Sequence, residues 1–347
     1  MFVLENTNAD PFNGTFTFKG QITDSTDKWA IDGTVFQNPT TGNLYYIWSG
    51  WEGDVLAQQL LYIAQLSDPW TISSERVEIS RAIYSWERNG YVNEGPEVII
   101  RNGVISLVYS GSGGWTNDYC LGLITASTSS NPLNASSWTK RPTAVFKSGN
   151  GIIAPGHHSF TKSRDGKEDW IVYHSARYNG SGWTRQIRTQ RFTWNADSTP
   201  NFGNPVNPNT PIRIPSGDPL RDRYEAETAS LLNNPLALGE ASASSRVKVG
   251  YIDFTNSAVV FNVSCTKTGS YVITIRNGNG SPSNATATHL VSINGAAPRE
   301  ISIVYSGWNR WGTTMFRYYL LQGVNTFTFT KGTNFAEIDF IDVFPDT

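Results

Sequence analysis

The sequence lacks an excess of either charge, because 27 Lys and Arg residues are balanced by 29 Asp and Glu residues. Without net charge there is no long-range field to attract nucleic acid or an anionic membrane surface, so we expect neither partner. No apolar run is long enough to cross a bilayer. Cysteine is almost absent: we expect Cys120 and Cys265 in different domains, which excludes a disulfide framework and a Cys-rich metal site. We expect no organic cofactor.

Long helical patterns are also missing, since no segment keeps an apolar period of 3.6 residues. The chain instead contains short apolar and aromatic runs separated by Gly, Pro, Asn and Asp, such as NLYYIWSG, GVISLVYSG and DWIVYHSA. Such runs are typical of strands, so the sequence predicts an all-β protein. Aromatic residues make up 13% of the chain, with 12 Trp. Because flat indole faces suit stacking against sugar rings, a neutral carbohydrate is the expected ligand.

Two domains are expected from the length of 347 residues. The segment 203–222 carries five prolines without a strand pattern and suits a linker or a closing segment. We therefore place the domains at 1–220 and 223–347 and expect a monomer. Asn-x-Ser/Thr triplets favour a secreted glycoprotein, with chance triplets in Asn-rich loops as the alternative. They begin at Asn13, Asn134, Asn179, Asn262, Asn279 and Asn284.

A repeat dominates the first domain. Three similar stretches begin with IDGTVF, NEGPEV and PGHHSF, 62 residues apart in both intervals, and each is a strand, a turn and a second strand ending in Ser. A unit of about four strands repeated around an axis is typical of a β-propeller, in which the first strand of each blade lines the axis. Asp32, Glu94 and the Gly156–His157 pair would then converge. A solenoid with the same period would keep them apart.

Asp32 and Glu94 suit glycoside hydrolysis, which needs one carboxylic acid to protonate the leaving oxygen and one carboxylate to activate water or attack the sugar. Glu94 lies in Asn-Glu-Gly-Pro, near the aromatic residues Tyr84, Trp86 and Tyr91. Partial burial there would raise its pKa, as a general acid at neutral pH requires. Either residue alone would more often be a turn carboxylate that accepts backbone hydrogen bonds. Their equivalence in a repeat favours catalysis.

Histidine, arginine and tryptophan supply further candidates in this domain. His157 could bind a metal or orient a carboxylate, whereas His158 is expected to be structural, because adjacent strand residues face opposite sides. Arg185, in GWTRQIRTQRFTW, could hold a sugar hydroxyl or pair with an acid, and an exposed strand arginine is the alternative. Trp86 is the candidate for stacking on substrate.

The motifs WAIDGTVF, YYIWSGWEGD, YVNEGPE, PGHHSF and DWIVYHSA resemble glycoside hydrolase family 43, in particular its α-L-arabinofuranosidase branch, over 1–220. The resemblance implies a five-bladed propeller that inverts stereochemistry with three carboxylates and acts on arabinan or arabinoxylan. It implies that Asp32 tunes the pKa of the acid, that Glu94 is the general acid, and that His157 reaches a central calcium or sodium ion through water. Xylosidases, arabinanases and galactanases of the family remain alternatives.

The family's third carboxylate, the base, is an aspartate of the first blade in an Ala-Asp-Pro context. Asp10 has this context, but the repeat aligns Asp10 with Asp68 and Asn131, which begin outer-strand turns. We therefore expect Asp10 to be structural, the first blade and the base to be missing from this chain, and an extracellular protein whose signal peptide is also missing. The alternative is a short form, or an inert fragment, that binds sugar without cleaving it.

The second domain alternates short strands with Gly and Asn turns, which predicts a β-sandwich or jelly roll. Its motifs, among them YEAETASL, VKVGYIDF and FAEIDFIDV, resemble carbohydrate-binding modules of family 35 and the related family 6 over 223–345. Glu225 and Glu227 are expected on one face of the opening strand, and Asp339 near the end of the last. Such oxygen ligands suit a structural Ca²⁺, which the resembled modules hold. The alternative is a solvated charged face.

Aromatic and amide side chains in the end loops of this domain would contact sugar. The candidates are Tyr251, Trp308 and Asn334, and Trp311 is equally suited to the core. The sequence thus predicts a hydrolase propeller followed by a module that holds a plant cell-wall polysaccharide.

Overall fold

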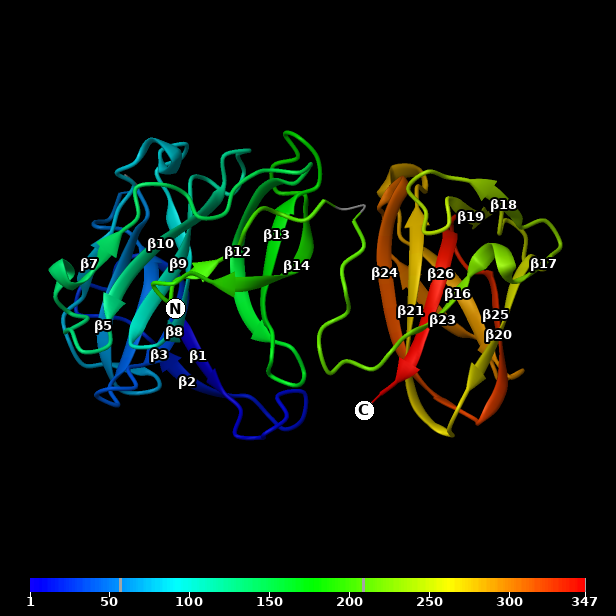
Figure 1. The fold of residues 1–347 in the computed structure, drawn as a ribbon, viewed down its shortest axis with the longest axis horizontal. Coiled ribbons are helices and arrows are strands. Elements are labelled where there is room, and N and C mark those ends of the chain that lie inside the picture. Colours follow the sequence, from blue (N-terminus) through cyan, green and yellow to red (C-terminus); the bar gives the residue numbers. More distant parts are fainter. Residues whose placement is uncertain (56–57, 208–209, 347) are drawn as a thin grey trace. The chain divides into compact units, whose positions relative to one another are not determined.

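The computed structural model describes residues 1–55, 58–207 and 210–346, and the chain there is built almost entirely of strands (Figure 1). Helical structure in these residues is limited to single 3-10 turns. They are η1 (Ser85–Glu87), η2 (Ala135–Ser137), η3 (Ala226–Thr228) and η4 (Pro282–Asn284). In the described parts of the chain no helix has the length and apolarity needed to span a membrane. The predicted all-β class is confirmed.

Contacts divide the chain into two compact units, Met1–Gly217 and Asp218–Thr347. The division lies within the proline-rich segment 203–222. Cys120 lies in unit 1 and Cys265 in unit 2, and both are buried free thiols.

Unit 1 consists of a hairpin followed by three antiparallel sheets of similar construction. The hairpin pairs β1 (Phe2–Glu5) with β2 (Thr17–Gln21). The first sheet contains β3 (Ala30–Gln37), β4 (Leu44–Gly50), β5 (Leu60–Asp68) and β6 (Thr71–Ile72), with β7 (Val77–Ser80) beside β5. The second contains β8 (Asn93–Arg101), β9 (Val104–Gly111), β10 (Cys120–Ser127) and β11 (Thr139–Lys140). The third contains β12 (Ile153–Lys162), β13 (Asp169–Ala176), β14 (Arg185–Trp194) and β15 (Pro200–Asn201).

The three sheets pack face to face, as successive blades of a propeller do. The first strand of the second sheet, β8, contacts the first strands of the other two, β3 and β12. One apolar core lies between the first and second sheets and includes Ile47, Leu61, Ile105, Leu107 and Ile124. Another lies between the second and third sheets and includes Val108, Leu121, Leu123, Ile171 and Tyr173. The repeat predicted from the sequence therefore corresponds to three blade-like sheets.

Each first strand contains a β-bulge at the same place. The last residues paired before the bulge are Ile31, Glu94 and Gly156. The residues that follow them have a positive φ: Asp32 (55°), Gly95 (54°) and His157 (48°). Bulges with such residues reorient neighbouring side chains and recur next to active sites.

The bulges correct the alignment expected from the sequence by one residue. Asp32 is equivalent to Gly95 and His157, whereas Glu94 is equivalent to Ile31 and Gly156. A shift of one residue moves a strand side chain to the opposite face, so two equivalent carboxylates are not what brings Asp32 to Glu94. The bulge does so instead, because it turns the Gly95 N–H toward the carboxylate of Asp32.

Serine side chains join neighbouring blades at this level. Ser49, opposite Ile31, donates to the Asn93 carbonyl at 2.8 Å. Ser110, opposite Glu94, accepts from the His157 N–H at 2.8 Å. Both residues are the Ser that ends the second strand of the sequence repeat, and both are fully buried.

Unit 2 is a sandwich of two antiparallel sheets. One contains β18 (Leu236–Gly239), β19 (Val247–Gly250), β26 (Glu337–Pro345), β21 (Gly269–Asn279) and β24 (Gly307–Leu320), with β16 (Asp222–Glu225) beside β26. The other contains β17 (Ser230–Leu232), β20 (Ala258–Cys265), β25 (Gly323–Lys331), β22 (Ala287–Ile293) and β23 (Arg299–Ile303). The core between them includes Phe261, Ile273, Phe327, Phe329 and Ile341.

Two expectations for unit 2 need correction. The opening strand ends at Glu225, and Glu227 lies in the 3-10 turn η3, so the two glutamates do not share a strand face. The triplet at Asn279 cannot carry a glycan in the folded protein, because Asn279 is fully buried and its amide donates to the carbonyls of Ala285 and Ile303.

Candidate functional site

Glu94 and Asp32 lie next to each other where β3 and β8 meet. The Gly95 N–H, exposed to Asp32 by the bulge in β8, donates to Asp32 Oδ2 at 3.0 Å. The left-handed backbone at Gly95 favours glycine, and His157 Nδ1 would lie 3.3 Å from a Cβ added there. The side chain of Tyr119 donates to Glu94 Oε1 at 2.7 Å. Asp32, Glu94 and His157, predicted to converge, are therefore brought together.

The surroundings of Glu94 raise its pKa. Burial is the largest cause, and the negative charge of Asp32 acts in the same direction. The Tyr119 hydrogen bond and the charges of His157 and Arg185 oppose this shift and do not overcome it. A carboxyl group with a raised pKa stays protonated closer to neutral pH, which suits a general acid.

Three rings line this site behind the carboxylates. Tyr119 stacks on His174, with ring centroids 5.5 Å apart, and His174 stacks on His157 at 6.0 Å. The Tyr119 hydroxyl also lies 3.3 Å from His157 Nδ1, and His157 Nε2 lies 3.8 Å from Asp32 Oδ1. Burial lowers the pKa of His174 to about 4, so this ring is neutral at working pH.

Tyr119 and His174 were not among the residues selected from the sequence. His174 ends the apolar run of DWIVYHSA and pairs with Gly156 in the repeat, so its position in the repeat was a usable signal. Tyr119 directly precedes β10 and is fully buried. Its partners Glu94 and His157 lie far away in the chain, and no motif marks it.

Arg185 reaches the site from the start of β14. Its Nη2 donates to the Gly114 carbonyl at 3.0 Å, while its buried Nε has no hydrogen-bond partner among the described residues. Its charge lowers the pKa of Glu94, which places the guanidinium within electrostatic reach of the carboxylate. This geometry suits contact with a polar group on a ligand.

Trp86, the predicted stacking residue, packs against the second sheet. Its ring lies against Gly111 and near Tyr109, and its indole nitrogen donates to the Pro142 carbonyl at 2.9 Å. It lines a pocket of about 610 Å³ that also includes Tyr119. The aromatic side chain that donates a hydrogen bond to Glu94 is Tyr119, whereas the Trp86 ring packs against Gly111 at the end of β9.

His158 and Asp10 lie in structural positions. His158 is buried against Phe160, and burial lowers its pKa to about 3. Asp10 is exposed in the loop of the β1–β2 hairpin, where its carboxylate accepts from the Phe12 N–H and the Asn13 side chain. The loop after Asp68 joins β5 to β6 in the next sheet, in line with the alignment of the repeat.

Unit 2 has a pocket of about 350 Å³ lined by aromatic side chains and an ion pair. Tyr251 and Trp308, both about half exposed, lie there with Phe335. The buried pair Lys248–Glu337 lies 2.8 Å apart. Glu337 Oε1 is buried without a hydrogen-bond partner among the described residues, so it could accept a hydrogen bond from a ligand hydroxyl.

Asn334 and Trp311 lie outside the lining of this pocket. The Asn334 amide donates to the Thr286 carbonyl at 2.7 Å, next to the pocket residue Phe335. Trp311 donates to the Ser242 hydroxyl at 3.1 Å and its ring lies 5.0 Å from the Arg276 guanidinium. Trp311 therefore belongs to a polar cluster rather than to the core.

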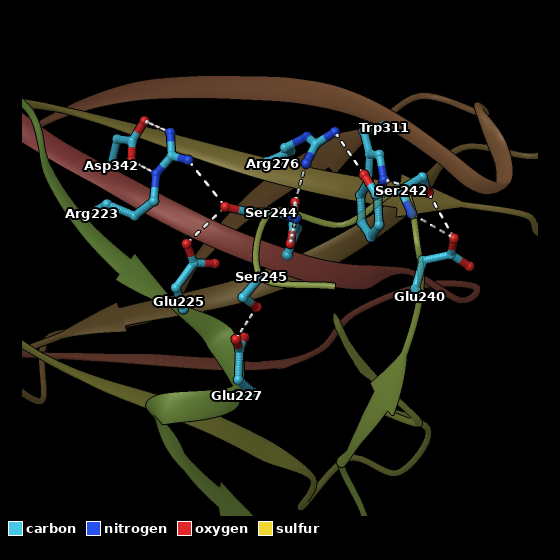
Figure 2. Close-up of polar contacts among 11 residues, drawn as sticks. Arg223, Glu225, Glu227, Glu240, Ser242, Ser244, Ser245, Arg276, Trp311 and Asp342 are labelled. Carbon is cyan, nitrogen blue, oxygen red and sulfur yellow. Dashed lines mark hydrogen bonds and ion pairs between the residues drawn. The ribbon is translucent and has the colours of Figure 1, made fainter. Parts of the chain in front are cut away.

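Figure 2 shows this polar cluster, which includes Glu225 and Glu227 of the predicted calcium site. Its labelled members are Arg223, Glu225, Glu227, Glu240, Ser242, Ser244, Ser245, Arg276, Trp311 and Asp342. The Ser244 hydroxyl donates to Glu225 Oε1 at 2.8 Å, and the side chain of Ser245 donates to Glu227. Glu225 Oε2 and Glu227 Oε2 are buried and have no hydrogen-bond partner among the described residues. Burial is the largest cause of the raised pKa of Glu225, and the charge of Glu227 contributes. Two buried carboxylate oxygens without a hydrogen-bond donor are suitable ligands for a hard cation such as Ca²⁺.

Asp339 fits a cation less well in this arrangement. Both of its oxygens accept from the Ser244 N–H, at 3.0 and 3.1 Å, and the Arg276 guanidinium donates to one of them. Within 1–55, 58–207 and 210–346, no three or more His, Cys, Asp and Glu side chains are arranged to hold a metal ion. The calcium site remains a prediction that the two glutamates support.

Comparison with known proteins identifies relatives of unit 1. The family model described as Glycosyl hydrolases family 43 matches residues 1–200. An extracellular exo-α-(1→5)-L-arabinofuranosidase of Streptomyces avermitilis is 43% identical over 234 residues, which cover 65% of this chain and 48% of the relative. The chain spans about half the length of the curated relatives it matches.

Solved structures of glycoside hydrolases are also similar to this chain. An α-L-arabinofuranosidase from Lactobacillus brevis superimposes with a TM-score of 0.56 at 36% identity, covering 60% of this chain and 67% of the other. An exo-β-1,3-galactanase from Phanerochaete chrysosporium superimposes with a TM-score of 0.55 at 20% identity. The superposition covers 95% of this chain and 72% of the galactanase chain. The likeness to the galactanase concerns the fold alone, and it extends over both units.

Proposed function

The chain belongs to glycosyl hydrolases family 43, and we propose that it hydrolyses α-L-arabinofuranosyl linkages in plant cell-wall polysaccharides such as arabinan and arabinoxylan. The observation that carries this proposal is the junction of β3 and β8, where a partly buried Glu94 with a raised pKa lies beside Asp32. The arabinofuranosyl linkage rests on the similarity to arabinofuranosidases at 36–43% identity.

In this proposal Glu94 is the general acid that protonates the leaving oxygen, and Asp32 raises its pKa and orients the sugar. Arg185 contacts the substrate beside Glu94. We propose an inverting reaction, in which a separate carboxylate activates water, and we assign that base to no residue of this chain. His157, beside Asp32, is the proposed contact, through water, to a central calcium or sodium ion.

Substitution of Glu94 by Gln tests the assignment. The variant keeps the size and hydrogen bonding of the side chain but cannot give up the proton, so arabinose release should fall by about 10²- to 10⁴-fold. Glu97→Gln is the matched control, since Glu97 lies on the same strand and is also partly buried. Equal activity in Glu94→Gln and the unaltered chain would refute the acid assignment.

The substrate panel for this assay decides between the alternatives. Release of xylose or galactose in place of arabinose would identify a xylosidase or galactanase, and release of internal oligosaccharides would identify an arabinanase. Binding of polysaccharide without release of any sugar by the unaltered chain would favour the carbohydrate-binding alternative. We further propose an extracellular, monomeric protein, by analogy with relatives named as extracellular.

Unit 2 is proposed to be a carbohydrate-binding module that holds the chain on its polymer. The pocket at Tyr251 and Trp308 supports this, because it combines exposed aromatic faces with a buried carboxylate acceptor at Glu337. Attachment raises the local concentration of substrate at the hydrolase unit without changing its chemistry. Trp308→Ala should weaken retention of the chain on immobilised arabinan or arabinoxylan, and unchanged retention would contradict the assignment.

A structural calcium ion is proposed beside the opening strand of this module. Glu225 and Glu227 would hold it through the two buried oxygens that have no partner among the described residues. The bound ion would offset the repulsion between the two carboxylates. Asp339 would join them only after exchanging its contact with Arg276.

A further inference from the structure

Two exposed indoles lie together on the surface of unit 1. Trp115, in the loop between β9 and β10, is 47% exposed, and Trp183, in the loop between β13 and β14, is 68% exposed. Their ring centroids are 5.8 Å apart, with planes inclined by 37°. Large apolar side chains gathered on a surface in this way usually mark a binding site.

Both rings are held in place before any ligand arrives. The Trp115 ring lies on the backbone of Gly90 and Gly113, where an added Cβ would lie 3.0 and 2.6 Å from it. The guanidinium of Arg185 lies 4.4 Å from the centre of the Trp183 ring. A platform fixed by its own neighbours loses little conformational freedom on binding.

The loops that carry the two indoles are also joined to each other. The side chain of Asn117 donates to Asn179 Oδ1 at 2.5 Å and accepts from the Gly180 N–H at 3.1 Å. Arg185 adds a third link through its bond to the Gly114 carbonyl. The two indoles therefore form one surface built from two blades.

This surface is continuous with the proposed acid. A Cβ added at Gly114, the residue before Trp115, would lie 3.5 Å from Glu94 Oε1 and 2.6 Å from Arg185 Nη2. The backbone next to Trp115 thus lies close to the carboxyl group of Glu94. Arg185, which contacts the Trp183 ring, also lies close to Gly114. A ligand that contacts Glu94 would therefore lie close to the loop that carries Trp115.

We propose that Trp115 and Trp183 form a stacking subsite for the sugar residue on the leaving-group side of the bond that Glu94 protonates. A general acid must lie beside the leaving oxygen, so the sugar that departs lies on the side of the acid. Indole faces suit the C–H faces of neutral sugar rings. The subsite takes a neutral oligo- or polysaccharide chain, and it rests on the proposed function of Glu94.

Binding by variants that cannot turn over substrate tests this subsite. In a Glu94→Gln, Trp308→Ala background, which removes the proposed acid and the proposed contact of unit 2, calorimetry would measure the affinity for arabino- and xylo-oligosaccharides and for arabinose. Trp115→Ala and Trp183→Ala should each weaken oligosaccharide binding by about tenfold and leave the affinity for arabinose unchanged. Trp183→Phe should restore part of the loss, and Phe12→Ala, at an aromatic residue 97% exposed in the same unit, should change nothing.

The outcomes for the subsite and for the acid are distinguishable. Unchanged oligosaccharide affinity in both Trp→Ala variants would overturn the subsite, even if Glu94→Gln abolishes hydrolysis. Equal loss of arabinose and oligosaccharide affinity would also overturn it, since it would indicate general damage to the fold. Weaker oligosaccharide binding together with undiminished hydrolysis by Glu94→Gln would leave the indoles as a sugar-binding surface, but it would refute the acid and overturn the assignment of the indoles to the leaving-group side.

Discussion

At the scale of single residues, the hydrogen bond from Tyr119 to Glu94 adjusts the charge state of the proposed acid. The phenol stabilises the carboxylate, so its removal should raise the pKa of Glu94 further. A hydrogen bond to a charged group stabilises that group by about 1.5–3 kcal/mol, which corresponds to a change of about one or more in the pKa of the carboxyl group. Because the acid acts in its protonated form, Tyr119→Phe should move the alkaline limb of the kcat/KM profile upward by about one pH unit.

Tyr173→Phe is the matched control for this profile. Tyr173 is also a buried tyrosine of unit 1, and its hydroxyl bonds Gln190 at 3.2 Å. Its substitution should leave the alkaline limb in place. A downward shift in Tyr119→Phe would show that the phenol favours the protonated carboxyl group, contrary to the geometry.

The sequence predicted part of this environment. The sequence predicts burial of Glu94 among aromatic residues, but it does not single out Tyr119, the tyrosine that donates a hydrogen bond to Glu94. Tyr84, Trp86 and Tyr91 lie within ten residues of Glu94, whereas the contacting ring, Tyr119, comes from a different part of the second sheet. Which side chain fills the space beside Glu94 depends on packing within and between sheets, which local sequence does not encode.

At the scale of elements, a buried ion pair secures the start of β8. Glu87, in η1, is fully buried and pairs with Lys140 of β11. It also accepts from Tyr109 at 2.9 Å and from the side chain of Asn93, next to Glu94, at 3.0 Å. Glu87 thus connects η1 to β8, β9 and β11 of the second sheet.

Loss of the charge on Glu87 should destabilise unit 1 strongly. Glu87→Gln would leave the Lys140 ammonium buried without its counter-ion, which typically costs about 3–5 kcal/mol. Denaturant unfolding measures this loss. Asp197→Asn is the control, because the Arg141–Asp197 pair is solvent-exposed and should change stability by about 1 kcal/mol or less. Equal effects of the two substitutions would contradict the role of Glu87.

The proposed cation at the β16–η3 junction gives a second prediction at this scale. Added Ca²⁺ should raise the melting temperature of unit 2, and a chelator should reverse the rise, because an ion that binds only the folded state stabilises it by mass action. Glu225→Gln combined with Glu227→Gln should abolish the response. Glu240→Gln, at an acidic residue of the same polar cluster bonded to Ser242, should retain it. A response that persists in the double variant would refute the site.

At the scale of the whole molecule, the two units have separate cores and should respond separately to acid. His289 is the one histidine of unit 2, and it is buried next to Phe329. Burial lowers its pKa from 6.5 to about 4. Between these values the unfolded chain binds a proton that the folded unit does not, so the stability of unit 2 decreases as the pH falls.

At pH 4, protonation of His289 in the unfolded chain should lower the free energy of unfolding of unit 2 by up to about 3 kcal/mol. The figure follows from 1.36 kcal/mol for each unit of difference between the two pKa values. His289→Leu keeps an apolar side chain in the core and removes the titration. Calorimetric scans of the full chain between pH 7 and pH 4 should therefore show a shallower loss of stability for unit 2 in the variant. Identical slopes for the two proteins would contradict a neutral buried imidazole.

The sequence by itself determined the all-β class, the repeat, and the convergence of Asp32, Glu94 and His157, because strand period and repeat length are written along the chain. Only the tertiary structure decided the register, since a bulge adds one residue without changing the pattern and aligns Asp32 with Gly95 rather than Glu94. It also decided the side chains that complete the site. Tyr119 meets Glu94 and His174, and Trp115 meets Trp183, because strands and loops that are distant in the chain pack together in unit 1.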